Sequence, residues 1–303
     1  MQWGQIKSLL ILSFLILDIY LLGQFLEKKE LADITVLEEQ PSTIEEQLSL
    51  ENITIAELPE EVSEETYITV KQQLLKEEDL VAFDKKIFEQ TFLLDDYFIA
   101  SYLDDPIKVD ENATSEEITK LFQEIAYYPD EYVYGSWNKD LNIIMFFQQK
   151  MDRPIYYNQN GLVLLFLDEN NEINFYIQTL LGETESLGEK RKLIEPIRAI
   201  ETLYMANELH SDDEITKVNI GFHTRVPFEG DVQVFVPIWK VNVNKQEDYF
   251  VNAIEGFTFS TDEEEFLLDV INTAILKLQV QRSEDSPIDD MLDELKEISD
   301  TTG

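Results

Sequence analysis

The side chains that could perform chemistry are of few kinds. The chain has two histidines, His210 and His223, and no cysteine, so thiol nucleophiles and thiolate metal ligands are excluded. It also lacks a Gly-x-Ser-x-Gly elbow and a glycine-rich phosphate loop. Because His210 follows a predicted helix and His223 lies in a predicted strand, we interpret both as structural residues.

Carboxylates are abundant but carry little information. With 62 Asp and Glu residues, pairs at a glycosidase spacing arise by chance. The segment Asp168-x-Asn170-x-Glu172 resembles the opening of a calcium loop, but Ile173 occupies the position that needs glycine, so a hairpin turn explains it better. The sequence predicts no catalytic residue, no cofactor-binding residue and no metal ligand, and we expect a protein that is not an enzyme.

One acidic residue stands in an unusual place. Asp18 lies near the middle of an apolar run, Ser8 to Leu26, that is long enough to cross a bilayer as a helix. Thirteen Leu, Ile and Phe residues in this run outweigh the cost of one carboxyl, which we estimate at about 3 kcal/mol. The Asp18 carboxyl is either protonated or drawn toward water by local thinning of the bilayer, or it contacts another transmembrane helix. Ionisable residues inside a membrane usually face protein, which favours the helix contact.

The residues at the end of the apolar run distinguish a membrane anchor from a cleaved signal peptide. Residues 23–27 have no Ala-x-Ala-like site, which favours an uncleaved single-pass anchor at 8–26. The stub at 1–7 is too short to form a domain, so we expect a cytoplasmic N-terminus and an extracytoplasmic ectodomain.

Composition limits the partners of that ectodomain. The chain has 23 Lys and Arg against 62 Asp and Glu, a formal net charge of −39, which repels nucleic acid and attracts cations or basic partners. Hydrophobic residues make up 44% of the chain, with 18 Phe and 13 Tyr, which is enough to build a core.

The elements that must position the ectodomain's side chains form an α+β pattern. An acidic spacer with partial order is predicted at 27–65, with a short helix after Ser42 or Thr43 and a short strand at 53–55. The first unit, 66–185, begins with alternating strand-like stretches. A helix follows the capping box Thr114-x-x-Glu117, and antiparallel strands are then predicted at 131–137, 141–149, 161–167 and 173–181.

The same order recurs in a second unit, 186–282. A helix is predicted at 192–209, strands at 214–224, 233–243 and 248–254, and a closing helix after a Ser260 or Thr261 cap. The acidic tail, 283–303, contains a short amphipathic helix. We expect this helix to fray or to dock on its own domain, and we favour both over a helix dedicated to a partner. The sequence therefore predicts two helix-plus-antiparallel-meander units behind one transmembrane helix.

Three stretches of the chain carry a family pattern. They are Met1-x-Trp3-x-x-x-Lys7 with Leu17-Asp18-Ile19-Tyr20 and Gln24-Phe25; Pro154-Ile155-Tyr156-Tyr157-Asn158 to Gly161; and Val236-Pro237-Ile238-Trp239-Lys240-Val241 with Tyr249-Phe250-Val251-Asn252-Ala253-x-x-Gly256. In these stretches the chain resembles the YycI (WalI) family. The last stretch is also similar to PepSY-type modules, in which an aspartate is common where this chain has Asn252.

The resemblance implies an accessory membrane protein of low-GC Gram-positive bacteria. Such a protein pairs with a YycH-like sister protein in the bilayer. Together they modulate the WalK (YycG) sensor histidine kinase, which controls cell-wall metabolism, through transmembrane contacts that would include Trp3, Lys7 and Asp18. The resemblance supplies no catalytic residue. Trp239, Tyr249 and Asn252 are predicted to be structural, and Gly256 to occupy a turn with positive φ.

A function of another class stays open at this point. The acidic ectodomain could be a wall-facing sensor or hydrolase that binds cations or a cationic glycan. That alternative predicts a concave pocket with converging carboxylates.

Overall fold

The computed structural model describes residues 14–15, 17–18, 20–22, 43–56, 58–59, 62–81, 88–224, 232–259, 261–281 and 287–301. The chain divides into two compact units, Met1–Asn52 and Ile53–Gly303. Trp3 and Lys7 lie outside the described residues, as does much of the predicted anchor. Among the described residues, no helix is both long and apolar enough to cross a membrane.

Two parts of the first unit are described. The described positions between Phe14 and Leu22 are helical, and their side chains, including that of Asp18, are exposed. Helix α2 (Ile44–Leu50) begins at the predicted cap, where Thr43 Oγ1 accepts a hydrogen bond from the Glu46 amide at 3.3 Å and the Glu46 carboxylate accepts one from the Thr43 amide. The prediction of a capped helix in the spacer is confirmed.

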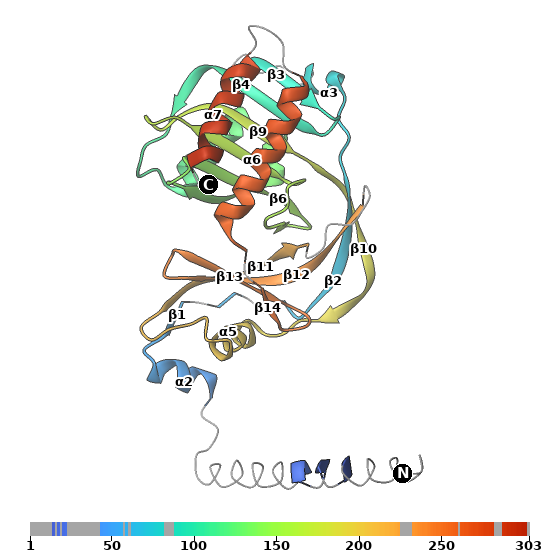
Figure 1. The fold of residues 1–303 in the computed structure, drawn as a ribbon, viewed down its shortest axis with the longest axis vertical. Helices are drawn as coiled ribbons and strands as arrows, with labels where there is room; N and C mark the ends of the chain where they lie inside the picture. The colour runs from blue at the N-terminus through green and yellow to red at the C-terminus, as the bar shows by residue number, and fades with distance from the viewer. Residues whose placement is uncertain are drawn as a thin grey trace, which may run out of the picture. The chain divides into compact units, whose positions relative to one another are not determined.

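The second unit is built on two sheets (Figure 1). The upper sheet is antiparallel, in the order β3-β4-β9-β8-β6-β5, and the short strand β7 pairs with β6. Its strands are β3 (Phe88–Leu94), β4 (Phe98–Lys108), β5 (Tyr132–Asn138), β6 (Ile143–Lys150), β7 (Arg153–Pro154), β8 (Leu162–Leu167) and β9 (Glu172–Thr179). The last four long strands in sequence form the predicted meander.

Helices cover both faces of the upper sheet. Along β8, Leu162, Leu164 and Phe166 face one core, and the alternate residues face the other. Helix α4 (Ser115–Ile125) packs on one face, while α6 (Glu263–Val280) and α7 (Pro287–Thr301) pack on the opposite face. Figure 1 shows α6 and α7 side by side across the strands. Short helical turns at α3 (Glu77–Val81) and η1 (Pro129–Glu131) complete this half.

The lower sheet forms the second meander. Its order is β1-β11-β12-β13-β14, with β1 parallel to β11 and the rest antiparallel. The strands are β1 (Thr54–Ile55), β11 (Glu214–His223), β12 (Val232–Val243), β13 (Glu247–Asn252) and β14 (Thr258–Phe259), and α5 (Pro196–Met205) packs on β12 and β13. Two long strands, β2 (Glu64–Gln72) and β10 (Leu181–Lys192), pair with each other along one side, and β2 also pairs with β12.

The α+β class is confirmed, and so is a helix before each meander. Three details differ from the sequence prediction. Residues 181–192 form a strand, so the helix predicted from Lys192 begins only at Pro196. The cap of α6 is Asp262, whose carboxylate accepts from the amides of Glu264 and Glu265. Helix α6 covers the upper sheet instead of closing the second unit, because its apolar face matches that sheet's core.

Candidate functional site

A polar face of the lower sheet forms one wall of the candidate site. Cross-strand partners point to the same face of a sheet, so the register defines three rows. The outer row is Lys217–Asn242–Asp248, the middle row Asn219–Lys240–Phe250, and the inner row Gly221–Ile238–Asn252. The rows change from charged to apolar toward the core, where Ile238 and Phe250 contact the cluster that includes α6. The outer part of this face therefore remains polar and accessible.

The free edge of β5 forms the opposite wall. Five consecutive residues, Val133 to Trp137, line the same cavity. A bulge between Tyr134 and Ser136 shifts the register against β6, and Gly135 sits there because a Cβ would lie 2.9 Å from the Met145 carbonyl oxygen.

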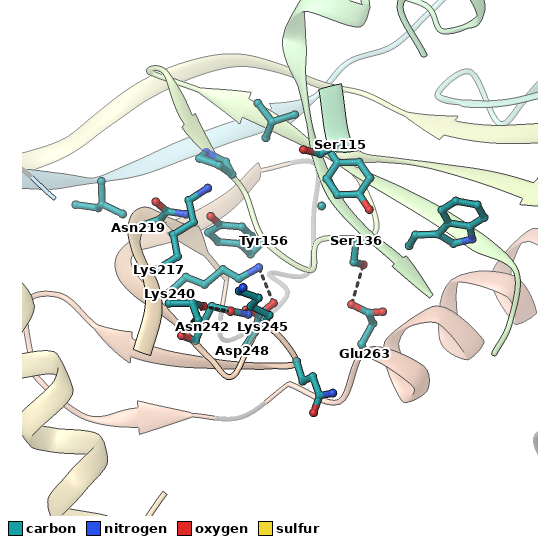
Figure 2. A pocket seen from close by; sticks show the side chains of 18 of the residues that line it. Ser115, Ser136, Tyr156, Lys217, Asn219, Lys240, Asn242, Lys245, Asp248 and Glu263 are labelled. Carbon is teal, nitrogen blue, oxygen red and sulfur yellow. Dashed lines mark hydrogen bonds and ion pairs between the residues drawn. The ribbon is translucent and has the colours of Figure 1, made fainter. Parts of the chain in front are cut away.

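Between these walls lies a cleft of about 1010 Å³. Its charged lining residues are three lysines and two carboxylates, a positive excess within a chain of net charge −39. Figure 2 shows Lys217, Lys240 and Lys245 gathered on one side and Ser136 and Glu263 on the other. The cleft thus differs in sign from the molecule as a whole.

One of the three cleft lysines is paired with a carboxylate, and the other two are not. Lys240 Nζ lies 2.6 Å from Asp248 Oδ2 and 5.0 Å from the centre of the Tyr156 ring, and its side chain is only 13% exposed. Asn242 Nδ2 donates to the other oxygen of Asp248 at 2.9 Å. Lys217 and Lys245 are exposed, and neither has an ion-pair partner among the described residues. Two positive charges are therefore available to a ligand.

The carboxylate on the other side is already engaged. Glu263 Oε2 accepts from Ser136 Oγ at 2.9 Å and from the Tyr157 hydroxyl at 3.2 Å, and Oε1 accepts from Asn138 Nδ2 at 3.3 Å. Burial, followed by the charge of Glu263, raises the pKa of Tyr157 far above its ordinary value, so this hydroxyl remains a donor. These bonds join α6 to β5.

At the floor of the cleft, strand β11 of the lower sheet lies close to Pro154 and Tyr156, which follow β6 of the upper sheet. A Cβ on Gly221 would lie 2.4 Å from the Tyr156 ring and 2.8 Å from the Pro154 carbonyl oxygen, so only glycine fits without a shift. Beside it, His223 Nδ1 lies 3.0 Å from the Tyr156 carbonyl oxygen and therefore carries the proton in this contact. Burial lowers the pKa of His223, and the bond to Tyr156 raises it by a smaller amount.

The family-pattern residues predicted from the sequence lie at the lower sheet. Trp239 is fully buried and donates from Nε1 to the Ile194 carbonyl at 3.0 Å. The Tyr249 hydroxyl donates to Glu247 at 2.7 Å. Asn252 Oδ1 accepts from the amides of Ile254 and Glu255, and Gly256 follows in the same turn with φ of +68°. These residues hold the sheet and its turn, outside the cleft lining.

The remaining candidates from the sequence lie elsewhere. His210 is largely exposed, and its Nδ1 lies 3.9 Å from Asp213. Asp168 Oδ1 accepts from the amides of Asn170 and Glu172 in the β8–β9 turn, so the hairpin prediction is confirmed. Among the described residues, no three His, Asp or Glu side chains are grouped so that they could hold a metal ion.

Five cleft residues were not predicted as site residues from the sequence: Lys217, Lys240, Lys245, Asp248 and Glu263. One signal was present, since polar Lys240 and Asn242 alternate with buried Trp239, Val241 and Val243 along β12. The acidic groove predicted by the alternative function is not found in this cleft, because lysines outnumber carboxylates and Asp248 and Glu263 are bonded on separate walls.

Comparison with known families identifies the group to which the chain belongs. The family model described as YycI protein matches residues 32–254, about three quarters of the chain. The chain belongs to the YycI family. The match includes both walls of the cleft except Glu263, and it begins after the predicted anchor. Membership supports a role as an accessory regulator of the WalK two-component system.

Other comparisons add distant likenesses. No curated protein matches the chain. An uncharacterized protein from Eubacterium rectale is similar over 70% of this chain and 91% of its own, with 10% identity and a TM-score of 0.43. The C-terminal domain of Bacillus megaterium YpeB is similar over 55% of this chain and 71% of its own, with 14% identity and a TM-score of 0.34.

Proposed function

We propose that this YycI-family protein is a membrane-anchored, non-enzymatic regulator that acts with a YycH-like protein on a WalK-like sensor histidine kinase. The observation that carries the proposal is the family match over 32–254, which covers all the described strands of both sheets except β14. An accessory role in the WalK system is the part that membership supports directly. The partner, the anchor and the contact mechanism are the parts that we add.

The anchor is the apolar run at 8–26, with the N-terminus in the cytoplasm and the ectodomain outside. The described part of this run supports it, since helical Phe14, Leu15 and Leu17 are each about half exposed, as are Leu21 and Leu22. Large apolar side chains gathered on one exposed helix mark a surface that another apolar phase covers. A bilayer provides such a phase along the whole run.

The working contact of the anchor is at Asp18. An ionisable group in the middle of an apolar span is costly unless a polar partner receives it, and another transmembrane helix can supply that partner. Trp3 and Lys7 would lie at the cytoplasmic boundary, where indole rings and ammonium groups are favoured. The helix therefore offers one polar contact site to the kinase or the sister protein.

Co-purification from membranes tests this proposal. Asp18→Leu keeps the span apolar and removes the polar group, so insertion should persist while recovery of the kinase falls several-fold. Asp18→Asn is the matched control, because its amide can still form a hydrogen bond, and it should retain most of the complex. Equal recovery of the kinase with all three proteins would remove the intramembrane contact from the proposal.

A further inference from the structure

The free edge of β5 lies in the cleft. Strand β5 ends the upper sheet, and β6 is its only neighbour among the described strands. The residues that line the cleft, Val133 to Trp137, are consecutive, so the backbone edge itself faces the cavity along with the side chains. Five residues of strand span roughly 17 Å, enough for a ladder of several backbone hydrogen bonds.

This edge carries a bulge at Gly135 but lacks two other common protections. Edge strands are commonly blunted by charged residues or proline, yet β5 reads Tyr-Val-Tyr-Gly-Ser-Trp-Asn and has neither. The lower sheet forms the opposite wall of the cleft across from this edge. An open, uncharged strand edge inside a cleft favours a guest with a peptide backbone.

The lysines on the opposite wall favour a guest that carries negative charge. Lys217 and Lys245 project from β11 and from the β12–β13 turn without ion-pair partners among the described residues, whereas Lys240 nearby is already paired with Asp248. On the β5 side, Glu263 disfavours a second carboxylate next to Ser136. The carboxylates of a guest are therefore drawn toward the lysine wall.

We propose that the cleft binds an acidic peptide segment in extended conformation, added as a strand to the free edge of β5, with its carboxylates on Lys217 and Lys245. Backbone hydrogen bonds to β5 supply affinity, and alternate acidic side chains supply specificity because successive side chains of a strand point to opposite sides. This peptide site goes beyond the regulatory role proposed above, and it does not depend on which helix the anchor contacts.

A labelled model peptide tests the site on the full-length protein in detergent. The probe is a fluorescein-labelled, capped heptapeptide with the sequence Thr-Glu-Val-Glu-Val-Glu-Thr, and binding is followed by fluorescence anisotropy at low salt. One comparison peptide has Lys in place of each Glu. A second keeps the Glu residues but carries N-methyl groups on alternate amides, which removes the donors that strand pairing needs.

Charge reversal in the protein locates the site. Lys217→Glu and Lys245→Glu should each weaken binding of the acidic peptide by about five- to tenfold, since each replaces an attraction between opposite charges with a repulsion between like charges. Lys190→Glu is the matched control, because Lys190 is exposed on β10 and does not line the cleft. All three lysines are exposed, and unchanged unfolding midpoints would show that the variants fold.

We expect the acidic peptide to bind and the Lys peptide not to bind. N-methylation of the acidic peptide should abolish its binding, and Lys217→Glu and Lys245→Glu should each weaken it. Binding of the N-methylated peptide at full strength would overturn strand addition to β5. Equal weakening by Lys190→Glu, or none by Lys217→Glu and Lys245→Glu, would overturn the cleft as the site. Absence of binding at millimolar peptide, or displacement of the peptide by an acidic polysaccharide at lower concentration, would overturn the choice of peptide as the ligand class.

Discussion

The two sheets of the ectodomain differ in how their faces are used. The upper sheet is covered by α4 on one face and by α6 and α7 on the other, and every residue of β8 is buried. The lower sheet buries Trp239 on the α5 side, while its other face turns polar toward the cleft at Lys217 and Lys240. A sheet covered on both sides contributes stability, whereas a half-covered sheet retains a surface that can recognise a partner.

The largest loss of stability is expected from a cavity in the upper sheet. Phe146 is fully buried and stacks on Phe122 with ring centres 3.8 Å apart. Phe146→Ala should lower the free energy of unfolding by about 3–5 kcal/mol, because it leaves a cavity between α4 and the sheet. Urea unfolding followed by circular dichroism measures the change. The control Leu276→Ala, at a side chain 67% exposed, should change it by less than about 0.5 kcal/mol.

A smaller loss is expected where the two sheets meet. Gly221→Ala would place a methyl group against the Tyr156 ring and the Pro154 carbonyl, and should cost about 1–3 kcal/mol. Gly182→Ala is the control, since its new Cβ would meet the flexible end of Gln73 at 2.9 Å. Similar unfolding midpoints for the two variants would show that the halves do not meet as tightly as described.

A third change compares a cleft ion pair with an exposed one. Asp248→Asn removes the charge opposite Lys240, whose ammonium is mostly shielded from water, and should cost about 1 kcal/mol. The exposed pair of Arg198 with Glu201 on α5 provides the control, and Glu201→Gln should change stability by less than about 0.5 kcal/mol. The two variants are compared by chemical unfolding at low and high salt, and equal costs would contradict the shielded state of Lys240.

The smallest effect concerns the acid sensitivity of buried His223, which contacts the carbonyl of the cleft residue Tyr156. Burial lowers the pKa of His223 in the folded protein below its unfolded value, so the unfolded state binds more protons around and below pH 6.5. The stability contributed by neutral His223 is thus present above pH 6.5 and is lost as pH falls through the folded pKa.

His223→Gln should therefore lose less stability than the parent protein between pH 7.5 and 5.5. Thermal unfolding at several pH values measures the difference, and His210→Gln, at an exposed side chain, should follow the parent. An identical pH slope for the parent and His223→Gln would contradict a buried neutral imidazole.

Local signals were sufficient for much of the upper sheet. The Thr114 capping box predicted α4, and the continuous apolar run at 161–167 predicted a strand, which the structure buries on both faces. Strand β10 escaped prediction because Gly182 to Lys192 are polar and mostly exposed, and its pairing with distant β2 supplies the hydrogen bonds. The cap of α6 was misplaced because Ser260, Thr261 and Asp262 are all capable caps in a row.

The cleft could not be predicted in the same way. Alternation along β12 indicates that Lys240 and Asn242 share a face, but their proximity to Lys217 depends on the register with β11. The approach of β5 depends in turn on Gly221, Tyr156 and Glu263, which are distant in sequence. Such a site is determined by tertiary packing, and no local sequence pattern encodes it.

The most direct test of the proposed function is the activity of the WalK-like kinase in liposomes. The kinase is reconstituted alone, with the full-length protein and its YycH-like partner, and with a version whose residues 8–26 are replaced by an apolar helix of equal length. We expect the full-length protein to change the autophosphorylation rate several-fold and the anchor replacement to abolish the change. An unchanged rate with the full-length protein, or the same change with the replaced anchor, would contradict the proposed function.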